Sequence, residues 1–149
     1  MFDTSKVGQS FSPFTIEVER GKIRELALAI GDENPIYQSK EVAQAAGYPD
    51  VPIYPTSPTT FSFWGNTKMI SQLSSLGINL MRVLHGEEEY EYLAPIYPGD
   101  TLTGVMTLVD AKTRQTQEAT LDILTLEIDY TNQHEVLVLK ARQVAIVRE

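Results

Sequence analysis

The segment SPTTFSFWGNTKMISQL, residues 57–73, holds a single charged side chain, Lys68, and decides which fold the chain can adopt. Its aromatic and aliphatic side chains predict one helix over Ser57–Leu73, with Ser57 as the N-cap and Pro58 at the first helical position. A helix this poor in charge is expected to be buried over most of its surface. The rest of the chain must therefore supply a layer that wraps around it.

Four strand patterns follow this helix and one precedes it. The expected strands are Phe11–Val18, Met81–Ala94, Thr101–Val109, Leu121–Tyr130 and Val136–Val147. Apolar and polar side chains alternate most clearly in Leu121–Tyr130, which is typical of a half-buried strand. Val136–Val147 is apolar nearly throughout, which is typical of a central strand or of one buried on both faces. The short connections predict that the four late strands pair antiparallel as a meander.

Two further helices are expected before the central one. Apolar side chains at helical spacing between Ile23 and Ile30 predict a helix that ends at Gly31. A shorter helix is predicted over Ser39–Ala46, followed by Gly47. The sum is an α+β chain with one domain over residues 1–149, in which a curved antiparallel sheet wraps around a central helix. This is the hotdog fold, whose exposed sheet edges favour pairing of subunits.

Composition narrows the function classes. The chain has 149 residues, 42% of them hydrophobic, and a net charge of −8, which argues against nucleic acid or an anionic membrane as a partner. With no cysteine and only two histidines, we expect neither a disulfide nor a metal site. The N-terminus lacks the pattern of a signal peptide, and no apolar run approaches membrane-spanning length. A cytoplasmic protein is therefore expected.

The stretch LAIGDENPIY, residues 28–37, carries the most specific chemical signal. Asp32, Asn34 and Tyr37 follow the predicted helix end closely, and Pro35 fixes its own φ and holds Asn34 extended. Such a stiff polar turn is a good place for a site. The alternative is that these residues simply form the helix C-cap and a turn, because Asp, Asn, Gly and Pro are common turn formers.

The run IGDENPIY, residues 30–37, resembles the signature Gly-Asp-x-Asn-Pro-hydrophobic-His of MaoC-like dehydratases and R-specific enoyl-CoA hydratases. Three more stretches are similar to the FAS1-like dehydratase (MaoC N-terminal-type) subgroup: ERGKIRE at 19–25, VLHGE at 83–87 and PIYPGD at 95–100. The resemblance extends over Phe11–Arg148 and agrees with the order of elements expected above. It implies a hotdog domain that forms a homodimer, or a heteromer with a second hotdog subunit.

The activity that the resemblance implies is hydration of trans-2-enoyl thioesters, or dehydration of (R)-3-hydroxyacyl thioesters, in fatty acid metabolism. The substrate would be carried on coenzyme A or an acyl carrier protein, with no further cofactor. Asp32 and Asn34 occupy the signature positions, whereas Tyr37 stands where the family has histidine. Because tyrosine titrates near 10 and histidine near 6.5, Tyr37 is a poor base at neutral pH. Asp32 remains a candidate base if burial raises its pKa.

Four other residues are candidates for substrate binding. In the family, N–H groups at the start of the central helix stabilise the enolate. The candidates here are therefore Thr56, Ser57 and Thr59. Pro58 has no N–H to donate. His85 is a candidate replacement acid–base group or a subunit contact. The alternative for His85 is a packed histidine on the sheet.

Three functions remain open after these observations. The first is a hydro-lyase that acts through Asp32, assisted by Tyr37 or His85. The second is a non-catalytic subunit that binds the acyl group and pairs with a catalytic hotdog partner. The third, a hotdog thioesterase, is disfavoured because those enzymes commonly place a carboxylate on the central helix, and Ser57–Leu73 contains none.

Overall fold

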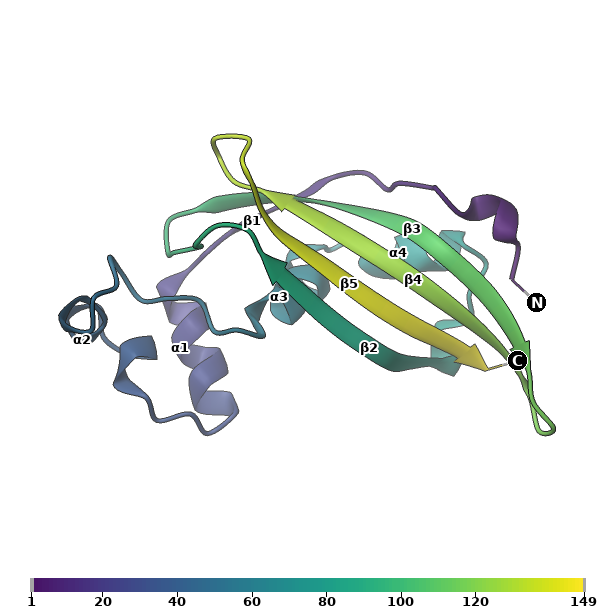
Figure 1. Cartoon of the computed structure of the whole chain (residues 1–149), viewed down its shortest axis with the longest axis horizontal. Helices are drawn as coiled ribbons and strands as arrows, with labels where there is room; N and C mark the ends of the chain where they lie inside the picture. The colour runs from purple at the N-terminus through teal and green to yellow at the C-terminus, as the bar shows by residue number, and fades with distance from the viewer. Residues whose placement is uncertain (1, 149) are drawn as a thin grey trace.

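A five-stranded antiparallel sheet arches over the helices of the central segment (Figure 1). The computed structural model describes residues 2–148. Its strands are β1 (Phe14–Glu17), β2 (Val83–Tyr92), β3 (Thr101–Gln115), β4 (Thr120–Thr131) and β5 (Leu137–Arg148), in the spatial order β1-β3-β4-β5-β2. The α+β hotdog prediction is confirmed. The early strand is shorter than the predicted Phe11–Val18, and β3 extends beyond the predicted end at Val109.

The predicted meander of four strands is wrong for β2. Strands β3, β4 and β5 do follow one another, but β2 pairs with β5 at the far edge of the sheet. The connection from Leu93 to Asp100 explains the difference. Leu93 N–H donates to Val138 O of β5 (2.9 Å), and Gly99 N–H donates to Val18 O, just beyond β1 (2.9 Å). The loop therefore crosses the end of the sheet from one edge to the other and is no hairpin.

The two early helices end as the sequence predicts. Helix α1 (Arg20–Ala29) closes with Gly31 at a φ of 76°, while Gly31 N–H donates to Leu28 O and Asp32 N–H to Ala27 O. This pair of hydrogen bonds is the Schellman arrangement, which requires a residue that tolerates positive φ. Helix α2 (Lys40–Ala45) is capped by Ser39. Short 3₁₀ turns form η1 (Thr4–Lys6), η2 (Pro35–Tyr37) and η4 (Leu80–Arg82).

The single helix predicted over Ser57–Leu73 is interrupted. It consists of α3 (Ser57–Thr60), a turn of π-helix η3 (Phe61–Gly65) and α4 (Met69–Ser75), and its N-cap is Thr56 rather than Ser57. The break lies at Asn66, whose side chain donates to Gln72 Oε1 (2.8 Å) and accepts from Lys68 N–H (3.2 Å). The side-chain amide of Asn66 thus satisfies one backbone N–H, that of Lys68, at the break and is itself held by the Gln72 side chain.

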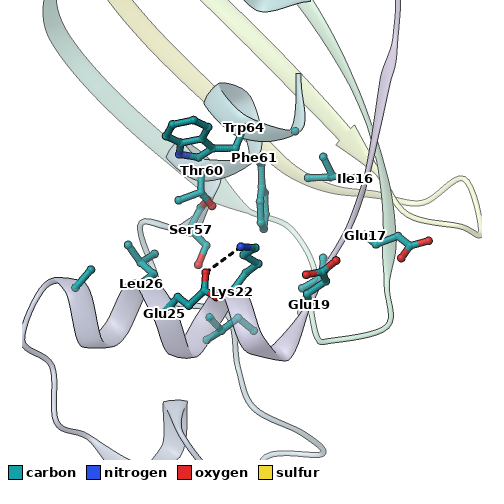
Figure 2. A pocket seen from close by; sticks show the side chains of 14 residues that line it. Ile16, Glu17, Glu19, Lys22, Glu25, Leu26, Ser57, Thr60, Phe61 and Trp64 are labelled. Atoms are coloured by element: carbon teal, nitrogen blue, oxygen red, sulfur yellow. Dashed lines mark hydrogen bonds and ion pairs between the residues drawn. The ribbon is translucent and has the colours of Figure 1, made fainter. Parts of the chain in front are cut away.

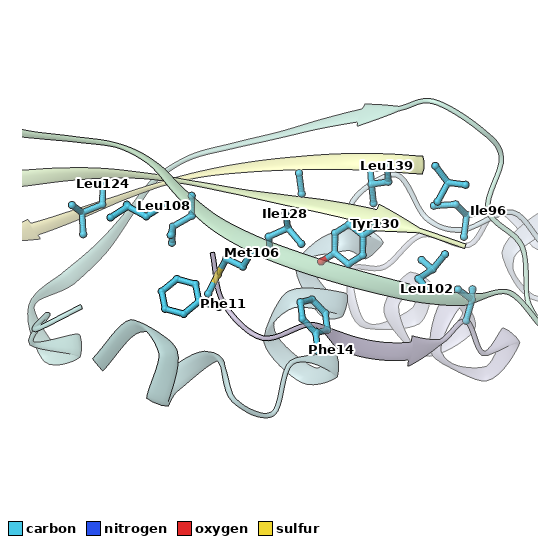
Figure 3. Close-up of a cluster of buried hydrophobic side chains, with 14 of the residues drawn as sticks. Phe11, Phe14, Ile96, Leu102, Met106, Leu108, Leu124, Ile128, Tyr130 and Leu139 are labelled. Carbon is cyan, nitrogen blue, oxygen red and sulfur yellow. The ribbon is translucent and has the colours of Figure 1, made fainter. Parts of the chain in front are cut away.

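The core fills the concave side of the sheet (Figure 3). Phe14 meets Tyr130 edge-on, with ring centroids 5.9 Å apart, and Phe61 brings η3 against the same tyrosine at 6.1 Å. The expectation that the central helix is buried over most of its surface is wrong for its outer side chains. Phe63, Trp64 and Ile70 are 53%, 82% and 64% exposed. Among residues 2–148, no helix is long and apolar enough to cross a bilayer.

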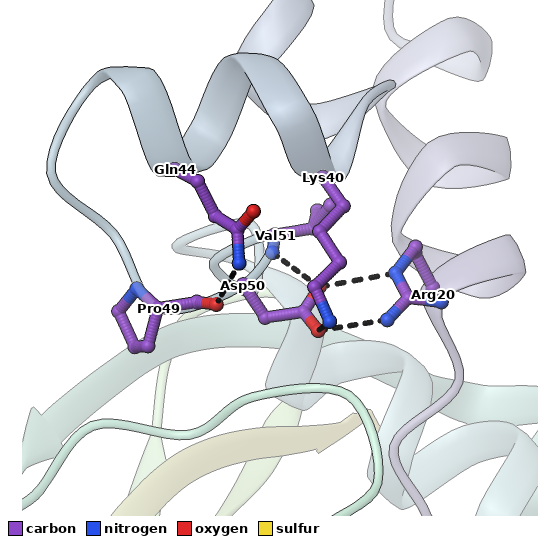
Figure 4. A network of polar contacts seen from close by, with 6 residues as sticks. All are labelled: Arg20, Lys40, Gln44, Pro49, Asp50 and Val51. Carbon is purple, nitrogen blue, oxygen red and sulfur yellow. Dashed lines mark hydrogen bonds and ion pairs between the residues drawn. The ribbon is translucent and has the colours of Figure 1, made fainter.

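An ion-pair clip fixes the helices that lie beyond the sheet (Figure 4). Asp50 receives two hydrogen bonds from Arg20 of α1 (3.0 and 2.7 Å), one from Val51 N–H (2.7 Å), and an ion pair from Lys40 of α2 (3.2 Å). Arg20, through its hydrogen bonds, is the main reason that the pKa of the Asp50 carboxyl lies far below its ordinary value of 3.8. The clip therefore ties α1, α2 and the 49–53 segment together.

Replacing Gly65 by Ala tests the contact between η3 and β1. A Cβ at Gly65 would lie 2.0 Å from Ile16 Cγ2. We expect Gly65→Ala to lower the free energy of unfolding by about 1–3 kcal/mol, as overpacking does. Gly21→Ala is the matched control in α1, where a Cβ meets nothing within 4 Å, and it should leave stability unchanged or higher. Urea unfolding of both variants measures this, and an equal effect at the two sites would contradict the packing argument.

Replacing Asp50 by Asn tests the clip. Because the folded pKa of Asp50 is lowered, its contribution to stability is present above about pH 4 and is lost as the pH falls below that value. Asp50→Asn should lower Tm at pH 7 by about 4 °C, and the gap to wild type should narrow below pH 4. Asp110→Asn, which breaks an exposed pair with Lys112, should change Tm little. A pH-independent gap for Asp50→Asn would contradict the assignment.

Candidate functional site

The predicted catalytic turn begins directly after α1. Asp32 Oδ1 accepts from Asn34 N–H (2.9 Å), and Asn34 Oδ1 accepts from Ile36 N–H (3.2 Å) as the N-cap of η2. Asp32 is half-buried, while Asn34 is exposed. The two polar side chains therefore build the turn that leads to Tyr37, as expected of a C-cap and turn, and their catalytic role stays a prediction.

Tyr37, the last residue of η2, lies against Tyr54, with ring centroids 4.9 Å apart and a tilt of 54°. Burial, followed by the nearby Asp32 carboxylate, raises the pKa of the Tyr37 hydroxyl. Burial, followed by a side-chain hydrogen bond with Asp32 and the charge of that carboxylate, raises the pKa of Tyr54. Both phenols therefore stay protonated at neutral pH. Beside Asp32 they are able to donate hydrogen bonds but are unable to accept a substrate proton as a base.

A pocket of about 550 Å³ opens between α1, β1 and the α3–η3 segment (Figure 2). This volume is in the range of small-molecule sites. Its walls are largely apolar, with Leu26 on the α1 side and Phe61 and Trp64 on the η3 side. The ion pair between Lys22 and Glu25 (2.9 Å) lies on the α1 side, beside Leu26.

Ser57 is the predicted substrate-binding residue that the structure places in this pocket. Its Oγ is buried, and no group in the described part of the chain forms a hydrogen bond with it. A buried hydroxyl without a partner is costly, so this atom is a ready donor or acceptor for a bound polar group. Of the residues described as lining the pocket, none is Asp32, Asn34 or Tyr37.

The other two candidates at the helix start point elsewhere. Thr56 is the exposed N-cap of α3. The Thr59 hydroxyl shares a hydrogen bond with the Tyr90 hydroxyl of β2, and burial raises the pKa of Tyr90 above its ordinary value. The sequence thus predicted Thr56, Ser57 and Thr59 as one group. In the structure Thr56 faces solvent, Ser57 faces the pocket and Thr59 faces the sheet.

His85 belongs to a polar group that the sequence did not reveal. His85 Nε2 lies 2.8 Å from Glu88 Oε2 on β2, and Gln143 of β5 donates to Glu88 Oε1 (2.9 Å) and to Ser62 Oγ (3.2 Å). This chain of contacts joins the edge strand to η3. Glu88 has the same strand parity as Tyr90, so alternation along β2 was the signal that places it on the inner face.

Comparison with known proteins gives the family. The model of the FAS1-like, dehydratase domain region matches residues 5–141. An UPF0336 protein of Streptomyces coelicolor is 38% identical over 135 residues, which cover 90% of this chain and 89% of that protein.

Two solved structures share the fold. One is a complex of HadBC, a 3R-hydroxyacyl-ACP dehydratase from Mycobacterium tuberculosis, with a TM-score of 0.76, 22% identity, and 95% of this chain and 96% of that chain covered. The other is the ChsH1-ChsH2 complex from the same organism, with a TM-score of 0.74, 21% identity, and 93% and 83% covered. The match over residues 5–141 and the shared fold lead to one conclusion: the chain belongs to the FAS1-like dehydratase family and has its hotdog fold.

Proposed function

We propose that this chain is the acyl-binding subunit of a heteromeric enoyl-thioester hydratase or 3-hydroxyacyl-thioester dehydratase, whose catalytic histidine comes from a second hotdog subunit. The proposal rests on Tyr37, which we infer to stand where the family has its histidine. Burial and the Asp32 carboxylate raise the pKa of this phenol, which moves it away from the neutral range.

The reaction requires a group that both takes and gives a proton. Addition of water to a conjugated thioester places a proton on the α-carbon and a hydroxyl on the β-carbon, and the reverse step removes both. A group with a pKa near the working pH does this best. Tyr37 and Tyr54 supply donors only, and Asp32 Oδ1 is engaged by Asn34 N–H. This supports a partner that supplies the missing base.

The pocket supports the acyl-binding role. Its apolar side chains suit an acyl chain, and Ser57 Oγ offers a buried polar contact for the thioester end. The thioester would be held on coenzyme A or an acyl carrier protein. Two observations support a second subunit: Phe63, Trp64 and Ile70 are exposed on the helical segment, and two of the similar structures are the HadBC and ChsH1-ChsH2 complexes.

The second candidate function is a self-sufficient hydro-lyase. It is favoured by Asp32, which keeps its signature position beside two phenol donors. In that case Tyr37 would act as the acid, and the chain as a homodimer would turn over without help.

Tyr37→His separates the two candidates. If the family's histidine is what this chain lacks, the variant should hydrate crotonyl-CoA about 100-fold faster than wild type near pH 7, in the range expected for a restored acid–base group. Tyr37→Phe is the control, which removes the hydroxyl without adding a base and should gain nothing. The disappearance of the conjugated thioester, followed by absorbance between pH 6 and 9, gives the rates. Efficient turnover by wild type alone, abolished by Tyr37→Phe, would contradict the proposal.

Trp64 is the single tryptophan of the chain and lines the pocket, so it reports acyl binding directly. We expect its emission to shift to the blue as dodecanoyl-CoA is added, because an 82% exposed indole becomes covered. Coenzyme A alone should give no shift. Ser57→Ala should weaken binding about tenfold, the equivalent of one lost hydrogen bond. The same response to coenzyme A as to its acyl form would contradict an acyl pocket.

A further inference from the structure

Three glutamates on the edge strand β2 form what we call the acidic row: Glu87, Glu89 and Glu91. All three are exposed, with the side chains of Glu87 and Glu89 at 71%. Tyr90 lies between two of them in sequence but turns inward to meet Thr59. The acidic row therefore lies on the outer face of the sheet at its free edge.

Charge alternates from strand to strand on this outer face. Two sets of residues lie directly opposite one another across β4, β5 and β2, and we call each set a rung. They are Glu127–Arg142–Glu89 and Asp129–Lys140–Glu91. Each rung places one cation between two carboxylates. Arg142 Nη1 forms ion pairs with two glutamates of β2, at 3.7 Å from Glu87 Oε2 and 3.8 Å from Glu89 Oε2. The two cations of β5 thus face five carboxylates, and the surplus negative charge lies at the edge.

The other side of β2 is open for pairing. Its strand neighbour is β5, and beyond it the sheet ends. Exposed apolar side chains flank the acidic row, namely Met81, Leu84 and Leu93. An edge strand with free backbone groups and apolar flanks is a template for another strand. A strand that pairs with the free edge of β2 is favoured if it places a lysine or arginine opposite Glu89 and Glu91.

We propose that the acidic row selects a different hotdog chain, one whose edge strand presents lysine or arginine on the outer face, and that it excludes pairing of β2 with a second copy. This inference rests on the proposed function and names the chemistry of the partner. In a symmetric antiparallel pairing centred on Glu89, the three glutamates lie opposite one another: Glu89 faces Glu89, and Glu87 faces Glu91. Like charges directly opposite each other on a sheet are destabilising.

The test uses a charge-reversed copy of this chain as the basic partner. Purified wild type is mixed with the triple variant E87K/E89K/E91K, and association is measured by sedimentation at low and high salt. The mixed pair should associate about tenfold or more tightly than wild type with itself, and high salt should reduce the difference. Backbone amides of Val83–Tyr92 should exchange with solvent more slowly in the mixture.

A second variant guards against misfolding, because the reversal adds cations beside Arg142 and Lys140. The neutral variant E87Q/E89Q/E91Q should associate with itself more tightly than wild type does, since the repulsion is gone. E33K/E118K/E135K is the matched control, with the same change of charge at exposed positions away from β2. Mixed with wild type, it should produce no slowing of amide exchange in β2. Circular dichroism verifies the fold of each variant.

Two results would overturn the inference. One is a wild-type chain that pairs tightly through β2 and is unaffected by E87Q/E89Q/E91Q. The other is a mixture with E87K/E89K/E91K that associates no better than the mixture with the control. Neither result depends on turnover or acyl binding. The acyl-binding role is tested separately, by the Tyr37 and Trp64 experiments.

Discussion

The close approach of η3 to β1 is the contact on which the rest of the structure depends. Gly65 brings the backbone of the central segment so near Ile16 that no Cβ fits between them. The helix breaks directly after this contact, where the Asn66 side chain accepts from Lys68 N–H and donates to the Gln72 side chain. The turn of π-helix that precedes the break directs Phe61 into the core and leaves Trp64 at the mouth of the pocket. Packing of one strand against one glycine thus helps to shape the pocket.

The chemistry of the candidate site follows from how its polar atoms are used. Asp32 and Asn34 each accept a backbone N–H that holds the turn. Both residues therefore have a structural role in this turn. Tyr37 is different, because a half-buried phenol beside a carboxylate holds its proton more tightly than a free one. The site therefore combines an intact scaffold with a group unsuited to base catalysis.

The boundaries of the two early helices were predictable from the sequence, because they depend on the residue types at the helix ends. Gly31 ends α1 because positive φ is required there, and Ser39 caps α2, both as their residue types indicate. The order β1-β3-β4-β5-β2 was not predictable from the strand patterns, because the loop after Leu93 binds two distant strands through its backbone. The break at Asn66 was equally hidden, since it depends on Ile16, far away in the sequence. Thr56, Ser57 and Thr59 were predicted as one group, and only the helix turn shows that they face three different ways.

We infer that this chain binds an acyl thioester without converting it. The most direct measurement mixes the wild-type chain, in excess, with a trans-2-enoyl-CoA and records Trp64 emission and the absorbance of the conjugated thioester in the same sample. We predict that the emission shifts as the thioester binds while its absorbance stays constant. Loss of the absorbance at the rate of binding, by the chain alone, would contradict the account.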